Sequence, residues 1–136
     1  MANDTTNEVE ISGDEETLAE IVKLMTEKHE GSKFDDVTFD KIIPMPKDID
    51  RNKQLSFRNR KKPNWYDWSK ENWGTKRDAY HTDIHDYGTS IVMRFQTAWA
   101  PPVEVAKELR RRFNSVKIKW MYNQEEDPRY QWQDLM

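Results

Sequence analysis

Two segments with helical periodicity, each lying between segments of alternating polarity, most strongly constrain the fold of this chain. The first begins near residue 12 and extends to about residue 30, and the second follows a Pro-Pro pair at 101–102. Their apolar stripes consist of Leu18, Ile21, Val22 and Met25 in the first, and Val105, Ala106, Leu109 and Phe113 in the second. A stripe with this spacing is typical of a helix that packs on a sheet through one face. We predict that a capping box of Ser12 and Glu15 begins the first helix.

Alternation of apolar and polar residues predicts the strands. They are expected at residues 7–11, 34–43, 79–85, 90–97 and 116–122. The resulting order predicts an α+β fold, the ferredoxin-like split βαββαβ, with an antiparallel sheet and two helices on one face. An aromatic-rich insertion at 44–75, containing a short helical turn, would lie between strands two and three. We expect one domain over residues 1–136, with tails at 1–6 and about 123–136.

Large rings must supply much of the core, because hydrophobic residues make up only 35% of the chain and mean hydropathy is -1.08. Six Trp, five Tyr and five Phe are available for this role, and each ring buries a large area. The chain has no Cys, which excludes disulfides, thiol nucleophiles and thiolate metal sites. The first residues lack a basic segment followed by an apolar one, and no apolar run is long enough for a membrane span, so we expect a cytoplasmic protein.

Three short strings resemble a known family. Residues 71–76 read Glu-Asn-Trp-Gly-Thr-Lys, residues 78–80 read Asp-Ala-Tyr, and residues 95–102 read Phe-Gln-Thr-Ala-Trp-Ala-Pro-Pro. They resemble the YubB-type ferredoxin-like domain family of bacteriophages, plasmids and prophages, over about residues 34–122. The chain departs from that pattern at two places. Arg77 stands where the family usually has Trp, and residues 124–128 stand where the family has a glycine-rich segment. The resemblance implies the fold and a mobile element in a bacterial host cell, but no activity.

Two rings in these strings flank residues that bend the backbone. Trp73 precedes Gly74, and Trp99 precedes Pro101 and Pro102. We interpret both rings as structural, with Trp99 pinning the corner between a strand and a helix. The alternative is that the strings form a binding groove.

Charge is distributed unevenly along the chain, although the net charge is only -3. Residues 1–30 hold nine acidic and two basic residues, whereas residues 47–62 hold seven basic and two acidic ones. Basic side chains neutralise phosphate, and rings stack on bases. The candidate contact residues for nucleic acid or protein are Arg58, Arg60, Lys61, Lys62, Trp65 and Trp68. Against nucleic acid, the aromatic string typical of RNA-recognition motifs is absent and the chain ends are acidic.

His81, Asp83 and His85 are the candidate metal ligands. Alternate residues of a strand share one face, so these three side chains would align along it. Imidazole and carboxylate groups suit zinc or a similar divalent ion. The same pattern is also typical of the solvent face of an edge strand.

Phosphate-binding loops and the common hydrolase motifs are missing, so we expect neither an enzyme nor a cofactor. Our leading hypothesis is a non-enzymatic accessory protein of a phage or mobile element that binds a host or phage protein. Inhibition of a host-defence nuclease, of CRISPR or restriction type, is one such role. The acidic segments at 4–20 and 125–134 could imitate phosphate in that case. The alternative is a nucleic-acid-binding domain that uses segment 47–62 with Trp65 and Trp68. The sequence leaves a homodimer open.

Overall fold

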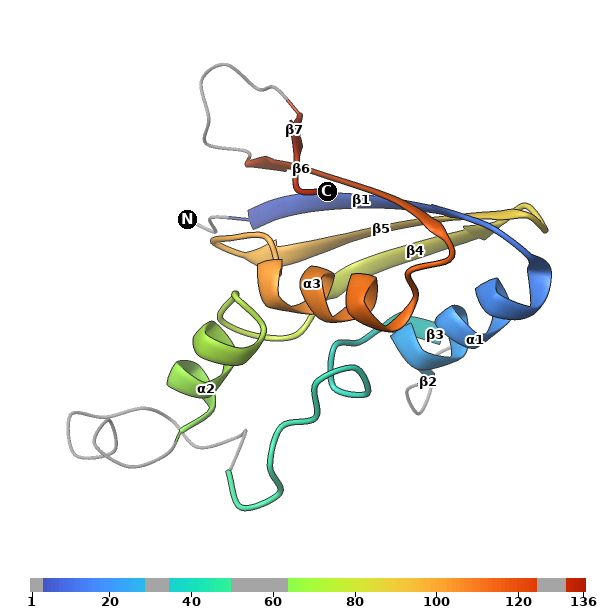
Figure 1. The fold of residues 1–136 in the computed structure, drawn as a ribbon. Helices are drawn as coiled ribbons and strands as arrows, with labels where there is room; N and C mark the ends of the chain where they lie inside the picture. Colours follow the sequence, from blue (N-terminus) through green and yellow to red (C-terminus); the bar gives the residue numbers. More distant parts are fainter. Residues whose placement is uncertain (1–3, 29–34, 50–63, 125–131) are drawn as a thin grey trace.

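The computed structural model describes residues 4–28, 35–49, 64–124 and 132–136. Its elements in chain order are β1 (Asp4–Ser12), α1 (Glu15–Met25), β2 (Thr26–Lys28), β3 (Asp35–Val37), α2 (Trp65–Asn72), β4 (Tyr80–Asp86), β5 (Ser90–Ala98), α3 (Val103–Arg112), β6 (Lys117–Gln124) and β7 (Gln133–Asp134) (Figure 1).

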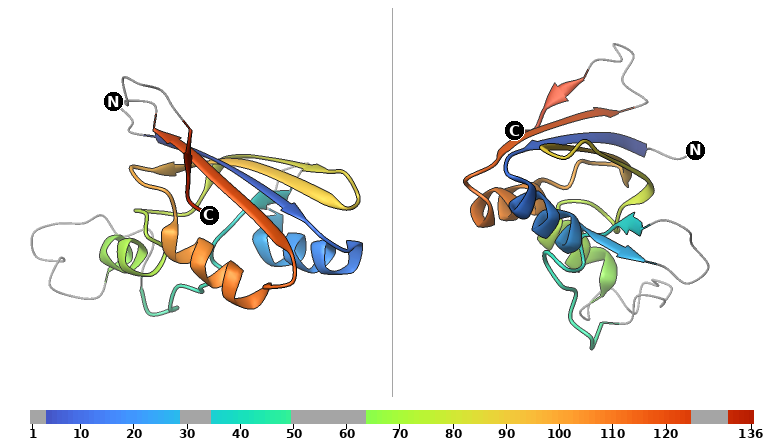
Figure 2. Two further views of the ribbon diagram at one scale, coloured as in Figure 1. Left: turned by 45° about the horizontal axis from the view of Figure 1, so that its top comes forward. Right: turned by 90° about the vertical axis from the view of Figure 1, so that its right-hand side faces the viewer.

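One sheet organises the molecule, with strand order β4-β5-β1-β6-β7 and every neighbouring pair antiparallel. The helices α1 and α3 lie on one face of this sheet, and among the described residues no helix covers the other face (Figures 1 and 2). Read along the chain, β1-α1-β4-β5-α3-β6 is a βαββαβ unit. The predicted ferredoxin-like fold class is therefore confirmed.

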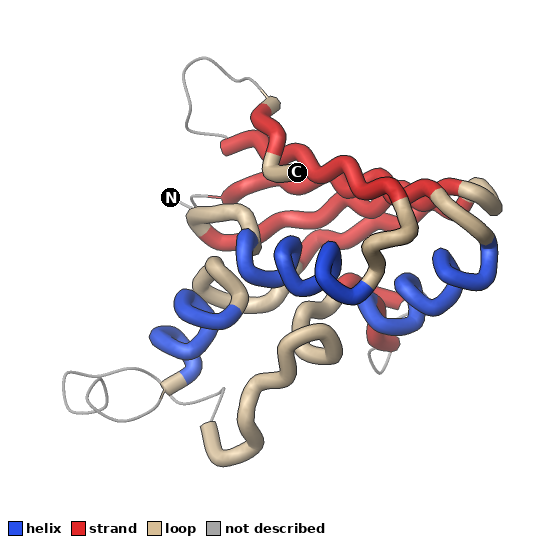
Figure 3. The backbone as a smooth tube through the Cα atoms, viewed as in Figure 1, coloured by secondary structure: helices blue, strands red, loops and turns tan. Residues whose placement is uncertain are grey.

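The segment between α1 and β4 differs from the prediction. Within 34–43, the structure has a strand only at Asp35–Val37, and this strand pairs with β2 in a separate two-stranded sheet (Figure 3). The second strand of the main sheet is β4. The aromatic-rich segment with α2 therefore precedes that second strand, instead of lying between the second and third strands.

The helix α1 begins and ends at residues other than those predicted. Its N-cap is Asp14, not Ser12, because the Asp14 carboxylate accepts a hydrogen bond from the Thr17 backbone N–H at 3.0 Å. The helix stops at Met25 rather than near residue 30. There the chain becomes extended in β2, and Lys41 donates to the Lys23 carbonyl at 3.1 Å, which satisfies part of the helix end.

Aromatic rings connect the parts of the core, as the composition predicts. Trp68, Trp73, Phe39, Phe95 and Trp120 contact one another in that order, edge to face, with centroid distances of 5.1, 5.9, 5.7 and 5.8 Å. This geometry is favoured between rings and adds to the effect of burial. The chain of rings joins α2 to the sheet.

The C-terminal residues return to the sheet, although the sequence predicts a tail from about residue 123. β6 continues to Gln124, and the Leu135 backbone N–H donates to the Trp120 carbonyl at 2.8 Å. Leu135 and Met136 also pack against the core. The final residues therefore cover part of the β6 edge.

Candidate functional site

The corner between β5 and α3 has an unusual backbone. Trp99 has a φ of 76°, and the Ala100 N–H donates to the Ala98 carbonyl at 3.0 Å, so the three residues form a γ-turn centred on Trp99. A bulky residue in the left-handed region is strained. Trp99 is also 53% exposed, so burial of its ring does not explain why a large residue occupies this position.

Three side chains fix this turn by donating hydrogen bonds to its carbonyl groups. Thr75 donates to the Ala98 carbonyl at 2.8 Å, Gln124 to the Trp99 carbonyl at 3.1 Å, and Thr97 to the Ala100 carbonyl at 2.7 Å. These side chains come from the segment after α2, from β6 and from β5. Strained residues persist where the surroundings determine the backbone in this way, and such positions cluster at functional sites.

A buried polar network supports the turn from inside the core. Asn7 donates to the Thr97 hydroxyl at 3.0 Å and accepts from the Trp120 indole N–H at 3.1 Å. Asn7, Thr97 and Trp120 are all fully buried. Since buried polar groups are costly without partners, this network fixes Thr97 in the orientation that lets it hold the corner.

Gly74 brings the two family-like strings into contact. It has a φ of 86°, and a Cβ atom there would lie 2.9 Å from the backbone N of Val103, in the first turn of α3. Both the left-handed backbone and the close approach require glycine. The α2 end and the β5–α3 corner are thus packed backbone to backbone.

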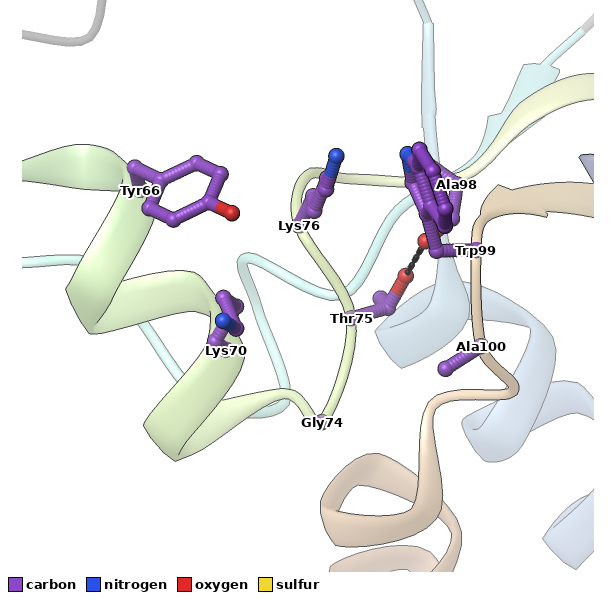
Figure 4. A pocket seen from close by; sticks show the side chains of 8 residues that line it. All are labelled: Tyr66, Lys70, Gly74, Thr75, Lys76, Ala98, Trp99 and Ala100. Atoms are coloured by element: carbon purple, nitrogen blue, oxygen red, sulfur yellow. Dashed lines mark hydrogen bonds between the residues drawn. The ribbon is translucent and has the colours of Figure 1, made fainter. Parts of the chain in front are cut away.

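A pocket of about 330 Å³ lies between these segments (Figure 4). Its lining residues are Tyr66, Lys70, Gly74, Thr75, Lys76, Ala98, Trp99 and Ala100. Figure 4 shows Tyr66 of α2 and Trp99 of the corner on opposite sides of it, with Lys76 between them.

Two ammonium groups lie over aromatic rings in this pocket. The Lys76 Nζ atom is 4.1 Å from the Trp99 ring centroid and 5.7 Å from that of Tyr66, and the Lys70 Nζ atom is 5.1 Å from the Tyr66 centroid. The lining contains no carboxylate, and none of the ion pairs among the described residues involves either lysine. The pocket therefore combines uncompensated positive charge with flat apolar surfaces.

The residues predicted as the contact site are not all part of this pocket. Arg58, Arg60, Lys61 and Lys62 lie outside the described residues. Trp65 and Trp68 are half-buried and pack against the core. Only part of each ring is therefore accessible, and a contact surface that uses Trp65 and Trp68 stays a prediction.

The predicted metal ligands lie on the exposed side of β4, but they have separate partners. His85 Nε2 lies 2.9 Å from an Asp83 carboxylate oxygen, whereas His81 Nδ1 lies 2.9 Å from the Gln96 side-chain oxygen. His81 sits in a β-bulge with a φ of 50°. In the described ranges, no group of three or more His, Asp or Glu could hold a metal ion.

The arginines at the end of α3 act within the fold. Arg110 donates to the Val116 carbonyl at 2.6 Å, and Arg112 donates to the Ile42 carbonyl at 2.8 Å. Arg111 and Arg112 also pair with Glu108, which lowers the pKa of that carboxyl to about 2. These contacts favour the structural interpretation of the cluster over an extended basic patch.

One half-buried carboxylate outside the pocket fixes the start of β4. Asp78 accepts hydrogen bonds from the Thr38 hydroxyl at 2.6 Å and from the backbone N–H groups of Phe39 at 2.7 Å and Ala79 at 2.8 Å. Burial raises the pKa of Asp78, and these hydrogen bonds oppose the rise. Since every contact is to the fold itself, Asp78 ties the loop after β3 to the sheet.

The sequence predicts a binding groove at the strings that contain Lys76 and Trp99 only as an alternative, places Tyr66 with the basic segment, and does not indicate Lys70 as part of a site. The signal was present in the two strings, because each places an aromatic residue or a lysine beside residues that bend the backbone. The contact between the strings cannot be read from a local pattern, because it joins positions more than 20 residues apart. The hydrogen bond from Thr75 to the Ala98 carbonyl is an example.

Fold and site together define a ferredoxin-like domain with a cationic, aromatic pocket at the β5–α3 corner. Residues 73–129 match a family model described as the ferredoxin-like domain in Api92-like protein. The match covers less than half of the chain, but it includes β4, β5, α3, β6 and most of the pocket. No curated protein and no solved structure matches the chain. None of the helices in the described ranges is long and apolar enough to span a membrane.

Proposed function

We propose that this chain is a non-enzymatic binding module that binds nucleic acid at the β5–α3 corner. The observation that carries the proposal is the Lys76 ammonium 4.1 Å from the exposed Trp99 ring, in a pocket without carboxylates. Proteins that bind single strands combine positive charge along the backbone with rings that stack on bases.

The basic segment at 47–62 remains part of this proposal because it directly precedes α2 in the sequence. Arg58, Arg60, Lys61 and Lys62 precede Asn64, the N-cap of the helix that carries Tyr66 and Lys70. We therefore retain these four residues as candidate phosphate contacts. Their charge would add to that of the pocket lysines for a ligand that extends beyond the pocket.

The open face of the sheet is a poorer candidate, although related folds bind RNA there. Val9 and Ile11 of β1 point into the core, so the alternating Glu8 and Glu10 face the other side. Arg94 pairs with Glu8 at 3.4 Å across that face. These carboxylates lie opposite Arg94 and Lys119 and offset their charge, so this face offers phosphate less net positive charge than the pocket does.

The test is a titration of a fluorescently labelled single strand of about 12 nucleotides, followed by anisotropy at about 50 mM and about 200 mM salt. We expect saturable binding that weakens as salt rises. The control variant is Lys119→Gln, which removes one exposed lysine from β6 and should leave the affinity unchanged. Failure to bind any strand at the lower salt concentration would overturn the proposal.

A second candidate function is protein binding. In this case the chain would be an accessory protein of a phage or mobile element that acts in the bacterial cytoplasm and inhibits a defence nuclease. The observation that favours it is the open face of the sheet, which carries Glu8 and Glu10 opposite Arg94 and Lys119, with the exposed ring of Tyr87 at its edge. Such a surface of alternating charges suits a partner with a complementary pattern of charge. Affinity purification from a bacterial lysate, with and without nuclease treatment, tests this candidate. A single partner retained after nuclease treatment and lost in a Glu8→Lys, Glu10→Lys variant supports it.

A further inference from the structure

The Trp99 ring is held ready before any ligand arrives. Its backbone is fixed by hydrogen bonds from Thr75, Thr97 and Gln124, while the residue remains 53% exposed. An exposed ring on a fixed backbone loses less conformational freedom when another flat group stacks on it than a ring on a mobile loop does. An ammonium can cover only one face of a ring, so the Lys76 contact leaves contact area for a second group.

One positive charge of the pocket lies over this ring, and the other lies over the ring of Tyr66. Lys76 lies between the rings of Tyr66 and Trp99, and Lys70 lies over the Tyr66 ring from the side of α2 (Figure 4). A ligand that satisfied both features would carry an anionic group within reach of the two lysines and a flat group against Trp99. A nucleotide has this combination, with a phosphate next to a base.

The dimensions of the pocket favour one such unit. A volume of about 330 Å³ is at the lower end of the range for small-ligand sites. In a duplex, both faces of each base are covered by neighbouring bases, so a stacking ring requires a base that is out of the stack.

We infer that the pocket takes one unpaired nucleotide, with its base on Trp99 and its phosphate at Lys70 and Lys76. This inference rests on the proposed nucleic-acid function and specifies that the pocket binds a single nucleotide of the ligand. Free mononucleotides and single strands share this chemistry, and the experiment distinguishes them.

The experiment measures anisotropy of the labelled single strand with three variants and one matched control. Trp99→Ala removes the stacking ring, Trp99→Phe keeps a ring, and a double variant, Lys70→Gln with Lys76→Gln, removes both charges. The control is Trp132→Ala, which removes another exposed ring, 5.8 Å from Arg94. Urea unfolding of each variant verifies that it is folded.

We expect Trp99→Ala to weaken binding by at least about fivefold, the lower end of what a stacked base contributes. Trp99→Phe should retain most of the affinity, and Trp132→Ala all of it. The double lysine variant should reduce the slope of log affinity against log salt by about 0.7, as expected for the loss of one neutralised phosphate on a single strand. A blunt-ended duplex of the same composition, which has no unpaired nucleotide, should compete poorly.

Competition by a mononucleotide would assign the pocket to free nucleotides, whereas a strand that binds without such competition would assign it to single strands. Equal binding of duplex and single strand, or an unchanged affinity in Trp99→Ala, would overturn the inference while leaving nucleic-acid binding in place. No binding of any nucleic acid would overturn the proposed function as well.

Discussion

The Nζ atom of Lys76 lies 4.1 Å from the centroid of the Trp99 ring, and the two residues come from two of the three sequence strings that resemble a known family. Neither string forms the pocket alone, because Lys76 follows α2 and Trp99 follows β5. Contacts made by backbone and hydroxyl groups, at Gly74 and Thr75, bring them together. The site is therefore a product of the packing between α2 and the β5–α3 corner.

Strain at Trp99 predicts an order of stability among variants. In Trp99→Gly the backbone adopts the φ of 76° without penalty, whereas in Trp99→Ala the Cβ atom still opposes it. Both variants lose the ring, so that loss cancels in the comparison. We expect Trp99→Gly to be more stable than Trp99→Ala by about 1 kcal/mol in urea unfolding. Equal stabilities would mean that the corner relaxes and stores no strain.

We expect alanine at Gly74 to lower the free energy of unfolding more than alanine at Gly88 does. The φ angles of the two glycines are nearly equal, at 86° and 87°. A Cβ at Gly74 would meet the α3 backbone at 2.9 Å, while a Cβ at Gly88 has only a Glu15 side-chain oxygen, at 3.5 Å. Gly88→Ala should cost about 1 kcal/mol from backbone strain alone.

Gly74→Ala should cost at least about 2 kcal/mol, because a close backbone contact adds to the same strain. The free energy of unfolding of both variants, measured side by side, isolates the contact with α3. A smaller loss at Gly74 than at Gly88 would contradict the packing described for the corner.

Thr97→Val tests whether the buried network holds the pocket. Valine keeps the shape of threonine but cannot accept from Asn7 or donate to the Ala100 carbonyl. We expect a loss of about 2 kcal/mol in the free energy of unfolding, since buried polar groups lose their partners. Binding of the labelled strand should weaken too, although Thr97 does not line the pocket. Lost stability with unchanged binding would show that the network does not position Trp99.

Asp78 predicts a distinct dependence of stability on pH. Burial raises its pKa above the usual value of 3.8 in the folded chain, so the folded state binds this proton more tightly than the unfolded state. The contribution of Asp78 to stability therefore falls as pH rises from 3.8 through the raised pKa. Asp78→Asn cannot titrate and should lack this fall.

Urea unfolding of the native chain and Asp78→Asn from about pH 3 to about pH 7 measures the difference. Asparagine can keep the contacts, because its oxygen can accept from Phe39 and Ala79 while its amide donates to Thr38. Asp78→Ala, which leaves these groups without a partner, should be destabilised at every pH by about 1–3 kcal/mol. Parallel pH curves for the native chain and Asp78→Asn would contradict the raised pKa.

The sequence predicts the central elements well because their patterns are local. Val9 and Ile11 alternate with acidic neighbours in β1, and Leu18, Ile21 and Met25 form the buried stripe of α1. The reliance of the core on rings also follows from composition, since Phe39, Trp73, Phe95 and Trp120 are all buried.

The errors lie where distant contacts decide the structure. The end of α1 depends on Lys41, which donates to carbonyls at its last turn, and nothing near residue 25 indicates this. The positive φ of Trp99 has no sequence signal, because such a backbone usually requires glycine. The pocket follows from that turn and from the position of α2, so its residues could be identified only after the fold was known.

The most direct test of the central claim is NMR observation of the indole N–H signals of the six tryptophans during titration with the unlabelled single strand. The Trp99→Phe and Trp132→Phe variants assign the two exposed indoles. The account predicts that the Trp99 signal shifts progressively and saturates, while the Trp132 signal and that of the buried Trp73 stay in place. A shift of Trp132 with an unchanged Trp99 signal would place the ligand elsewhere and contradict the account.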